Sequence, residues 1–260
     1  MLIAALPTSV RYIGTYSVGF DHIDVAAAKQ RDIAVLYTPD VLTDAVAETA
    51  MLHILGAMRR VTESVDLLRS RRWQGWTPVQ LPGRQLTRKR LGIFGMGRIG
   101  RAVAMRARAF GMEIHYHNTR RLPPELELGA QFHATTAAFL PHCQVLLLAC
   151  PLNTQTQHFL NAARIAQLPA EAVVVNIARG AVIDDDALIP ALQSGRIAAA
   201  GLDVFANEPN IDPRYYDLPN AFILPHIGSS TLEAREAMAR VLLDGLDALL
   251  AGEEASNRLV

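Results

Sequence analysis

A glycine turn between a short apolar strand and a helix is the feature that most constrains the fold of this sequence. Residues 91–94 read LGIF, residues 95–100 read GMGRIG, and an alanine-rich run follows. Gly95 permits a tight turn, Gly97 lets the backbone approach a pyrophosphate, and Gly100 lets the helix pack on the strand. The N-terminus of such a helix also offers free N–H groups and the positive end of its dipole. The turn therefore predicts a dinucleotide site.

Apolar strands alternate with helical segments on both sides of this turn. Before it, strands at 11–15 and 33–37 enclose an alanine-rich helix at 23–30, which makes one βαβ unit. After it, the sequence predicts six more strands: 113–117, 131–133, 145–150, 172–177, 198–205 and 221–224. A helix is expected over 184–194, and a long one closes the chain at 231–250. This alternation predicts an α/β fold with a mostly parallel, doubly wound sheet.

Two segments before the turn bear on assembly. The helix predicted over 45–58, for which Thr43 can serve as the cap, is apolar almost all round. Such a helix must be buried, either between domains or against another subunit, and it is the basis for expecting a homodimer. The polar stretch 69–90, with Trp73 and Trp76, is expected to be extended and docked on a surface.

Charge and cysteine content exclude several classes of protein. The 25 Lys and Arg residues balance the 25 Asp and Glu residues, so no overall field favours nucleic acid or an anionic membrane. No apolar run approaches the ~20 residues that a membrane span needs. Cys143 and Cys150 could form a disulfide, but buried thiols in a reducing cytoplasm are favoured. We expect a cytoplasmic protein with no nucleic-acid or membrane partner and no metal, since no zinc-type ligand spacing occurs.

Three polar residues follow three of the predicted strands. Arg179 comes after the strand that ends near 177, Glu208 after the strand that ends at 205, and His226 after the last strand. Each such residue alone is most often an ordinary surface residue. The carboxyl ends of parallel strands share one edge, which is also the edge of the glycine turn. Together the three residues therefore predict a catalytic site there.

At this point the chain resembles a known family, the D-isomer-specific 2-hydroxyacid dehydrogenases. The matching motifs are GMGRIG at 95–100, VNIARG at 175–180, GLDVF at 201–205 with Glu208-Pro209, and PHIG at 225–228. Within that family the sequence is most similar to bacterial glyoxylate/hydroxypyruvate reductases.

The resemblance implies two domains. Residues 42–229 would form the dinucleotide-binding Rossmann domain, and residues 1–41, completed by 230–260, a flavodoxin-like substrate domain. The family usually has a complete βαβα stretch before the strand equivalent to 11–15, and this chain starts just before that strand. We therefore expect an N-terminally truncated or reduced substrate domain, whether from truncation or a misassigned start, with activity in question.

The resemblance also implies roles for the strand-end residues. Arg179 would hold the substrate carboxylate and its neighbouring carbonyl oxygen, and His226 would be the general acid that protonates that oxygen. Glu208 would pair with the imidazole and favour its charged form. Backbone N–H groups of Val18 and Gly19 would complete the carboxylate site from the other domain.

The cofactor contacts implied by the resemblance surround the glycine turn. Asp203 would orient the nicotinamide amide. The remaining contacts would come from the three glycines of the turn with Arg98 and Ile99, and from Cys150 and Pro151.

The residues after the second strand of this domain indicate which cofactor is used. The strand at 113–117 runs into Asn118, Thr119, Arg120 and Arg121, without the acidic residue that NAD enzymes usually place on the ribose. Arginine can clamp a 2′-phosphate. We therefore expect contacts from Asn118, Arg120 and Arg121 and a preference for NADPH, with NADH the second choice. The alternative is that both arginines belong to a solvated loop.

Three functions remain open from the sequence. The first is an oxidoreductase that reduces glyoxylate, hydroxypyruvate or a related 2-keto acid to the D-2-hydroxy acid. The second is a catalytically impaired or cofactor-sensing protein on the same fold, similar to the C-terminal-binding corepressors. The third is another member of the superfamily, such as a phosphite or formate dehydrogenase. Retention of all three strand-end residues favours the enzyme, although the particular 2-keto acid is not fixed.

Overall fold

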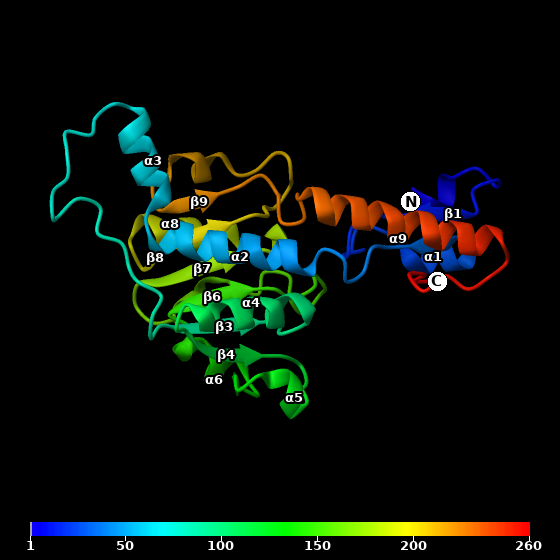
Figure 1. Cartoon of the computed structure of the whole chain (residues 1–260), viewed down its shortest axis with the longest axis horizontal. Coiled ribbons are helices and arrows are strands. Elements are labelled where there is room, and N and C mark those ends of the chain that lie inside the picture. The colour runs from blue at the N-terminus through cyan, green and yellow to red at the C-terminus, as the bar shows by residue number, and fades with distance from the viewer. Residues whose placement is uncertain (1) are drawn as a thin grey trace. The chain divides into compact units, whose positions relative to one another are not determined.

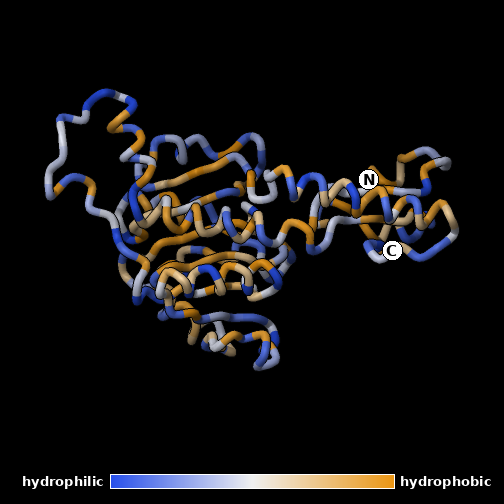
Figure 2. Tube along the Cα trace, in the orientation of Figure 1, coloured by the Kyte–Doolittle hydropathy of each residue, from blue (hydrophilic) through white to orange (hydrophobic). Residues whose placement is uncertain are grey.

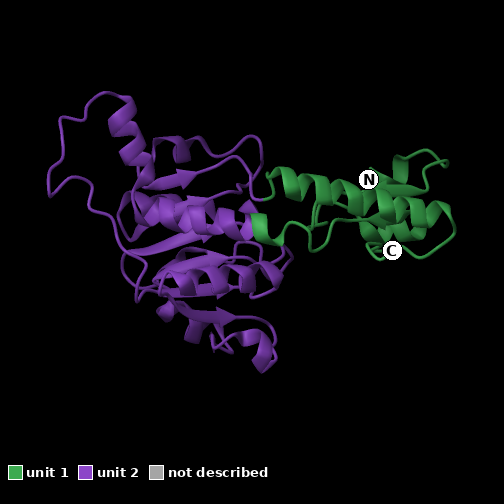
Figure 3. Cartoon of the chain, in the orientation of Figure 1, with its two compact units in different colours: residues 1–45, 229–260 green, residues 46–228 purple. Residues whose placement is uncertain are grey.

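The computed structural model describes residues 2–260 and consists of two compact units (Figure 3). One unit is Val46–Gly228, and the other combines Met1–Ala45 with Ser229–Val260. Within residues 2–260, no helix has both the length and the apolar character that crossing a membrane requires.

The larger unit contains a sheet of seven parallel strands (Figure 1). Its order is β5-β4-β3-β6-β7-β8-β9, and every neighbouring pair is parallel. The bounds are β3 Arg90–Phe94, β4 Glu113–His117, β5 Gln131–Phe132, β6 Val145–Leu148, β7 Ala172–Asn176, β8 Ile197–Leu202 and β9 Ala221–Ile223. The strand order reverses between β3 and β6, the switch point at which open α/β sheets bind ligands. The doubly wound α/β fold is confirmed.

Helices cover both faces of this sheet. They are α2 Thr43–Met58, α3 Val61–Arg69, α4 Arg98–Ala109, α5 Pro124–Glu127, α6 Thr136–Phe139, α7 Ala162–Ile165 and α8 Asp185–Gln193. Three 3₁₀ turns, η2 Leu140–His142, η3 Gly180–Val182 and η4 Pro213–Asp217, complete the unit. The central strands β6 and β7 are buried along their whole length, and their continuous hydrophobicity is visible in Figure 2. Strands covered on both faces read as unbroken apolar runs, which is why they could be found in the sequence.

Helix α2 is buried differently from our expectation. A Cβ on Gly201 of β8 would lie 2.7 Å from the backbone oxygen of His53, and one on Gly56 would lie 2.5 Å from the Phe222 ring of β9. From Val46 onward the helix therefore packs on the sheet of its own unit. The sheet of its own unit covers most of the helix, so burial of the helix does not by itself require another subunit or domain; Leu52 remains 46% exposed.

The stretch after α2 also differs from the prediction. Residues 61–69 form helix α3, which the sequence analysis did not identify. The first part of the following loop projects from the sheet in Figure 1, whereas its last part is docked on the unit, since Arg84 pairs with Glu171 at 2.8 Å and Leu86 is buried. Its Trp76 and Val79 are 81% and 80% exposed, and Trp73 is half exposed.

The smaller unit is built around two short parallel strands. These are β1 Tyr12–Gly14 and β2 Ala34–Leu36, with helices η1 Ile3–Ala5, α1 Val25–Gln30 and α9 Leu232–Leu250. The C-terminal residues run antiparallel beside β2 through a bridge between Leu36 and Arg258. The buried amide of Asn257 donates to the carbonyl oxygens of Tyr37 at 3.0 Å and Val241 at 2.9 Å. Residues from both ends of the chain thus share one small core.

Candidate active site

The glycine turn has the geometry of a phosphate cradle. Gly95 has φ +99°, and a Cβ there would lie 2.7 Å from the backbone nitrogen of Cys150, so both conformation and space require glycine. A Cβ on Gly100 would lie 2.6 Å from the Gly95 oxygen. Gly97 precedes α4, and a Cβ there would have no heavy atom within 4 Å. The space above Gly97, at the N-terminus of α4, fits the pyrophosphate of a dinucleotide.

The end of β4 supports this turn. The side-chain oxygen of Asn118 accepts a hydrogen bond from the Met96 N–H at 2.7 Å, and the Gly95 N–H donates to the His117 oxygen at 3.1 Å. Asn118 therefore fixes the loop that would receive the phosphates. Its direct contact with the cofactor stays a prediction.

Arg121, one of the two arginines after β4, is held by a buried carboxylate that our sequence reading missed. Its Nε and Nη2 donate to the Glu127 carboxylate at 2.8 and 3.0 Å, and Tyr116 donates to the same carboxylate at 2.6 Å. These contacts, with Arg121 first, lower the pKa of Glu127 to about 2. Arg121 nevertheless remains 65% exposed, and Arg120 is exposed as well. No acidic residue follows β4 directly, but α5 brings Glu127 to this loop from further along the chain.

Arg179 lies in a loop shaped by Asn176 at the end of β7. The Asn176 side chain donates to the Arg179 oxygen at 2.9 Å and accepts from the Ala178 N–H at 3.0 Å. The next residue, Gly180, touches the backbone after β8, because a Cβ there would lie only 1.8 Å from the Phe205 carbonyl carbon. Glycine at 180 thus lets the loop that carries Arg179 pack against the segment that leads to Glu208.

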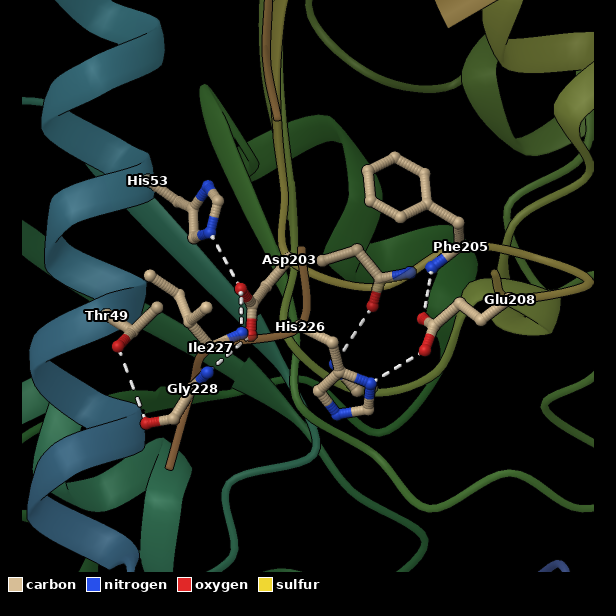
Figure 4. A network of polar contacts seen from close by, with 10 residues as sticks. Thr49, His53, Asp203, Phe205, Glu208, His226, Ile227 and Gly228 are labelled. Carbon is tan, nitrogen blue, oxygen red and sulfur yellow. Dashed lines mark hydrogen bonds and ion pairs between the residues drawn. The ribbon is translucent and has the colours of Figure 1, made fainter. Parts of the chain in front are cut away.

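Glu208 and His226 meet at the carboxyl edge of the sheet (Figure 4). Nδ1 of His226 lies 2.8 Å from Oε2 of Glu208, whose Oε1 accepts the Phe205 N–H at 2.7 Å. The pairing makes Nδ1 the ring nitrogen that carries a proton toward the carboxylate, and leaves Nε2 for another partner. The His226 side chain is 49% exposed, so a small molecule can reach it.

Asp203 is buried behind this pair and holds the loop of His226. Its two carboxylate oxygens accept the N–H groups of Ile227 at 2.9 Å and Gly228 at 2.8 Å. Burial favours the neutral acid, but a contact with His53 and these two N–H groups outweigh it and lower the pKa of Asp203. The predicted contact of Asp203 with a nicotinamide amide stays a prediction. His53 was not identified from the sequence, where a lone histidine in an apolar helix carries no specific signal.

Val18 and Gly19 lie in the other unit, in the loop after β1. Side chains brace this loop: the Thr15 and Ser17 hydroxyls lie 2.8 Å apart, and Ser17 donates to the Gly19 oxygen at 2.5 Å. Val18 and Gly19 are both partly exposed. Their role in carboxylate binding stays a prediction.

Both cysteines are free thiols, as favoured from the sequence. Burial raises the pKa of Cys150, just after β6, to about 12, and raises the pKa of Cys143 as well. Neither group is a reactive thiolate near neutral pH. Within residues 2–260, no group of three or more potential ligand side chains is arranged to hold a metal ion.

Comparison with known proteins places this site in a family context. The family model described as "D-isomer specific 2-hydroxyacid dehydrogenase, NAD binding domain" matches residues 51–228. Glycerate dehydrogenase of Hyphomicrobium methylovorum is 46% identical over 260 residues, which cover 99% of this chain and 81% of that protein.

Two solved structures are similar over nearly the whole chain. The glyoxylate reductase of Paecilomyes thermophila has a TM-score of 0.92 at 41% identity, covering 99% of this chain and 77% of that one. The NADPH-dependent glyoxylate/hydroxypyruvate reductase of Sinorhizobium meliloti, in complex with NADP and malonate, has a TM-score of 0.90 at 36% identity. That match covers 97% of this chain and 78% of the other.

Proposed function

Because this chain belongs to the D-isomer-specific 2-hydroxyacid dehydrogenase family and is an NAD(P)-dependent oxidoreductase, we propose that it reduces glyoxylate or hydroxypyruvate with NADPH. The product would be achiral glycolate from glyoxylate and the D-2-hydroxy acid, D-glycerate, from hydroxypyruvate. The observation that carries the proposal is the contact between His226 and Glu208 at the same sheet edge as the glycine turn. A corepressor-like or impaired protein is not favoured, since the similar proteins carry the names of dehydrogenases and reductases.

The proton chemistry follows from the His226 environment. Nδ1 faces the Glu208 carboxylate, so Nε2 would donate its proton to the carbonyl oxygen of the 2-keto acid. Glu208 would stabilise the imidazolium form and fix the ring, with its own orientation set by the Phe205 N–H. A bound nicotinamide supplies the hydride for the carbonyl carbon. Proton and hydride together convert C=O into CH–OH, and His226 is left neutral.

Substrate binding is assigned to one cationic side chain and two backbone groups. Arg179 would hold the carboxylate and the carbonyl oxygen through its planar fork of donors. The N–H groups of Val18 and Gly19 would bind the carboxylate. A substrate held in this way presents its carbonyl group in a fixed orientation, which is the main contribution that positioning makes to rate.

NADPH is proposed on the strength of the loop after β4. Arg120 is exposed and able to meet a 2′-phosphate, whereas Arg121 is committed to Glu127 through two hydrogen bonds. We therefore assign the phosphate contact chiefly to Arg120, and to Arg121 the task of fixing the loop. The similar Sinorhizobium meliloti enzyme is itself NADPH-dependent.

We further propose a homodimer, on a surface other than the one first expected. Helix α3 and the projecting loop expose Leu68, Trp73, Trp76 and Val79. Large exposed apolar side chains that are concentrated on one projecting segment are typical of an association surface. Sedimentation of the protein tests this, and a monomer at micromolar concentration that persists with and without cofactor would contradict it.

The proposed activity is tested by following NADPH oxidation with glyoxylate and with hydroxypyruvate, and cofactor reduction with phosphite and with formate, each as a separate addition. Phosphite and formate run in the opposite direction and are assayed with NADP⁺ and NAD⁺. We expect turnover with the two keto acids alone. Turnover with phosphite or formate alone would overturn the substrate assignment and leave the family assignment intact.

A further inference from the structure

His53 is a buried histidine that the chemistry above does not use. Its side chain has no exposed surface, and neither ring nitrogen has a hydrogen-bond partner among residues 2–260. Leaving buried polar atoms unsatisfied is costly, so such a residue in an otherwise apolar helix needs a physical explanation.

Close packing of α2 on the sheet determines where this ring lies. Gly201 has no side chain, and the space a Cβ would need is taken by the His53 backbone, 2.7 Å away. The ring also makes an edge-on contact with Phe222, with centroids 5.4 Å apart. Held by β8 and β9, the imidazole is directed to the end of β8, where Asp203 lies.

The ring lies beside Asp203, the residue that holds the backbone of the loop Pro225–Gly228, which carries His226. Nε2 of His53 lies 3.6 Å from Oδ1 of Asp203, within ion-pair distance (Figure 4). The same oxygen accepts the Ile227 N–H, and the other accepts the Gly228 N–H. His226, directly before Ile227, has φ +54°, a left-handed conformation that is unfavourable for histidine. Hydrogen bonds to Asp203 help to hold the backbone in this conformation.

A second residue of α2 reaches the same loop. The Thr49 hydroxyl donates to the Gly228 oxygen at 3.4 Å. Thr49 and His53 are four residues apart, so they lie on one face of the helix, one turn from each other. Helix α2 therefore supports this loop at two points, once directly and once through Asp203.

We propose that His53 is a positioning residue for the reaction, which acts through the Asp203 carboxylate to fix the loop Pro225–Gly228 and hence His226. A positively polarised group beside a buried carboxylate stabilises its charge, and a charged carboxylate is the stronger acceptor for the two N–H groups. The kinetic consequence rests on the proposed reductase function, whereas the structural consequence for the loop does not.

A matched pair of variants at position 53 tests whether the side chain must extend as far as the Asp203 carboxylate. His53→Gln carries an amide nitrogen near the position of Nε2, and His53→Asn carries the same amide too short to approach Asp203. Hydrogen exchange of the Ile227 and Gly228 amides is measured by NMR without substrate. We expect exchange about 10-fold faster in His53→Asn and within about threefold of wild type in His53→Gln. Leu52→Ala, an exposed position on the same helix, is the control and leaves exchange unchanged.

Kinetics then separate positioning from a general structural role. We expect His53→Asn to lower kcat about 10-fold while the Kd for NADPH changes less than about threefold, and His53→Gln to restore kcat. In an Asp203→Asn background His53→Asn adds no further loss of kcat, because the two act in series. Unchanged amide exchange in a folded His53→Asn variant, or additive losses in the double variant, would overturn the inference. A wild-type protein inactive on keto acids would instead overturn the proposed function, and the exchange result would stand.

Discussion

The Glu208 carboxylate lies 2.8 Å from Nδ1 of His226, at the end of a sheet whose switch point carries the glycine turn. Glu208 is itself oriented by the Phe205 N–H, so the acid and its partner are fixed by backbone on one side and by Asp203 on the other. His226, Arg179 and the glycine turn along one edge are the arrangement that the proposed keto-acid reduction needs.

Removal of the imidazole tests the general acid. His226→Ala should lower kcat by about 10² to 10⁴-fold, because alanine cannot supply the proton that we assign to the imidazole. The Kd for NADPH, measured by fluorescence titration, should change less than about threefold. A variant with near-normal turnover would remove His226 from the mechanism.

Removing the charge of the Glu208 carboxylate tests its pairing with His226. Glu208→Gln keeps the shape and a hydrogen-bond partner for Nδ1 but removes the charge that stabilises the imidazolium. We expect kcat to fall about 10 to 100-fold with cofactor affinity unchanged. An equal loss in Asp217→Asn, a carboxylate of η4, would show that the effect is not specific to the pair.

Substitution of the two arginines after β4 should change the KM values for NADPH and NADH in different ways. Arg120→Ala should raise the KM for NADPH at least about 10-fold and leave that for NADH nearly unchanged, because only NADPH carries the 2′-phosphate. Arg121→Ala, which frees Glu127, should affect both cofactors alike. The assignment fails if Arg120→Ala weakens the two cofactors equally or if the wild-type enzyme prefers NADH.

Alanine substitutions at two glycines should have different effects, one on the stability of the protein and the other on cofactor binding. Gly180→Ala forces a Cβ to within 1.8 Å of the Phe205 carbonyl carbon, so we expect a loss of about 2 kcal/mol or more in urea unfolding and lower kcat. Gly97→Ala meets no atom within 4 Å, so stability should hold while NADPH binding weakens. A stable, fully active Gly180→Ala variant would contradict this account of the loop.

A buried histidine cluster should make the protein sensitive to mild acid. Burial is the largest cause that lowers the pKa of His115, and the neighbouring charges of His142, His133 and Arg90 lower it further, to about 4. The unfolded chain, with a His115 pKa near 6.5, therefore binds more protons between pH 6.5 and 4. Stability should fall as the pH drops through this window, by about 3 kcal/mol in total. Urea unfolding of His115→Leu should show a flatter dependence, and an unchanged slope would refute the assignment.

Much of the fold could be read from local pattern. Strands such as β6 and β7 are short, largely apolar runs between turn signals, and their parallel pairing follows from the helices between them. The edge shared by Arg179, Glu208 and His226 followed from topology, because parallel strands bring their carboxyl ends together. The contact between Glu208 and His226, which the resemblance implied, is present in the structure at 2.8 Å.

What the sequence did not reveal depends on contacts between distant segments. Glu127 meets Arg121 only because α5 folds back on β4, and His53 meets Asp203 only because Gly201 admits α2 close to β8. The sequence of α2 is apolar on all sides, so its pattern does not say what covers it. That α2 packs on the sheet of its own unit could be seen only in the structure.

The most direct test is the wild-type enzyme with NADPH and hydroxypyruvate, followed by NADPH absorbance and by chiral analysis of the glycerate formed. We expect NADPH consumption equal to the glycerate produced, all of it the D-isomer, and no reaction with Arg179→Ala at the same enzyme concentration. The absence of turnover with hydroxypyruvate and with glyoxylate, using either NADPH or NADH, would contradict the account.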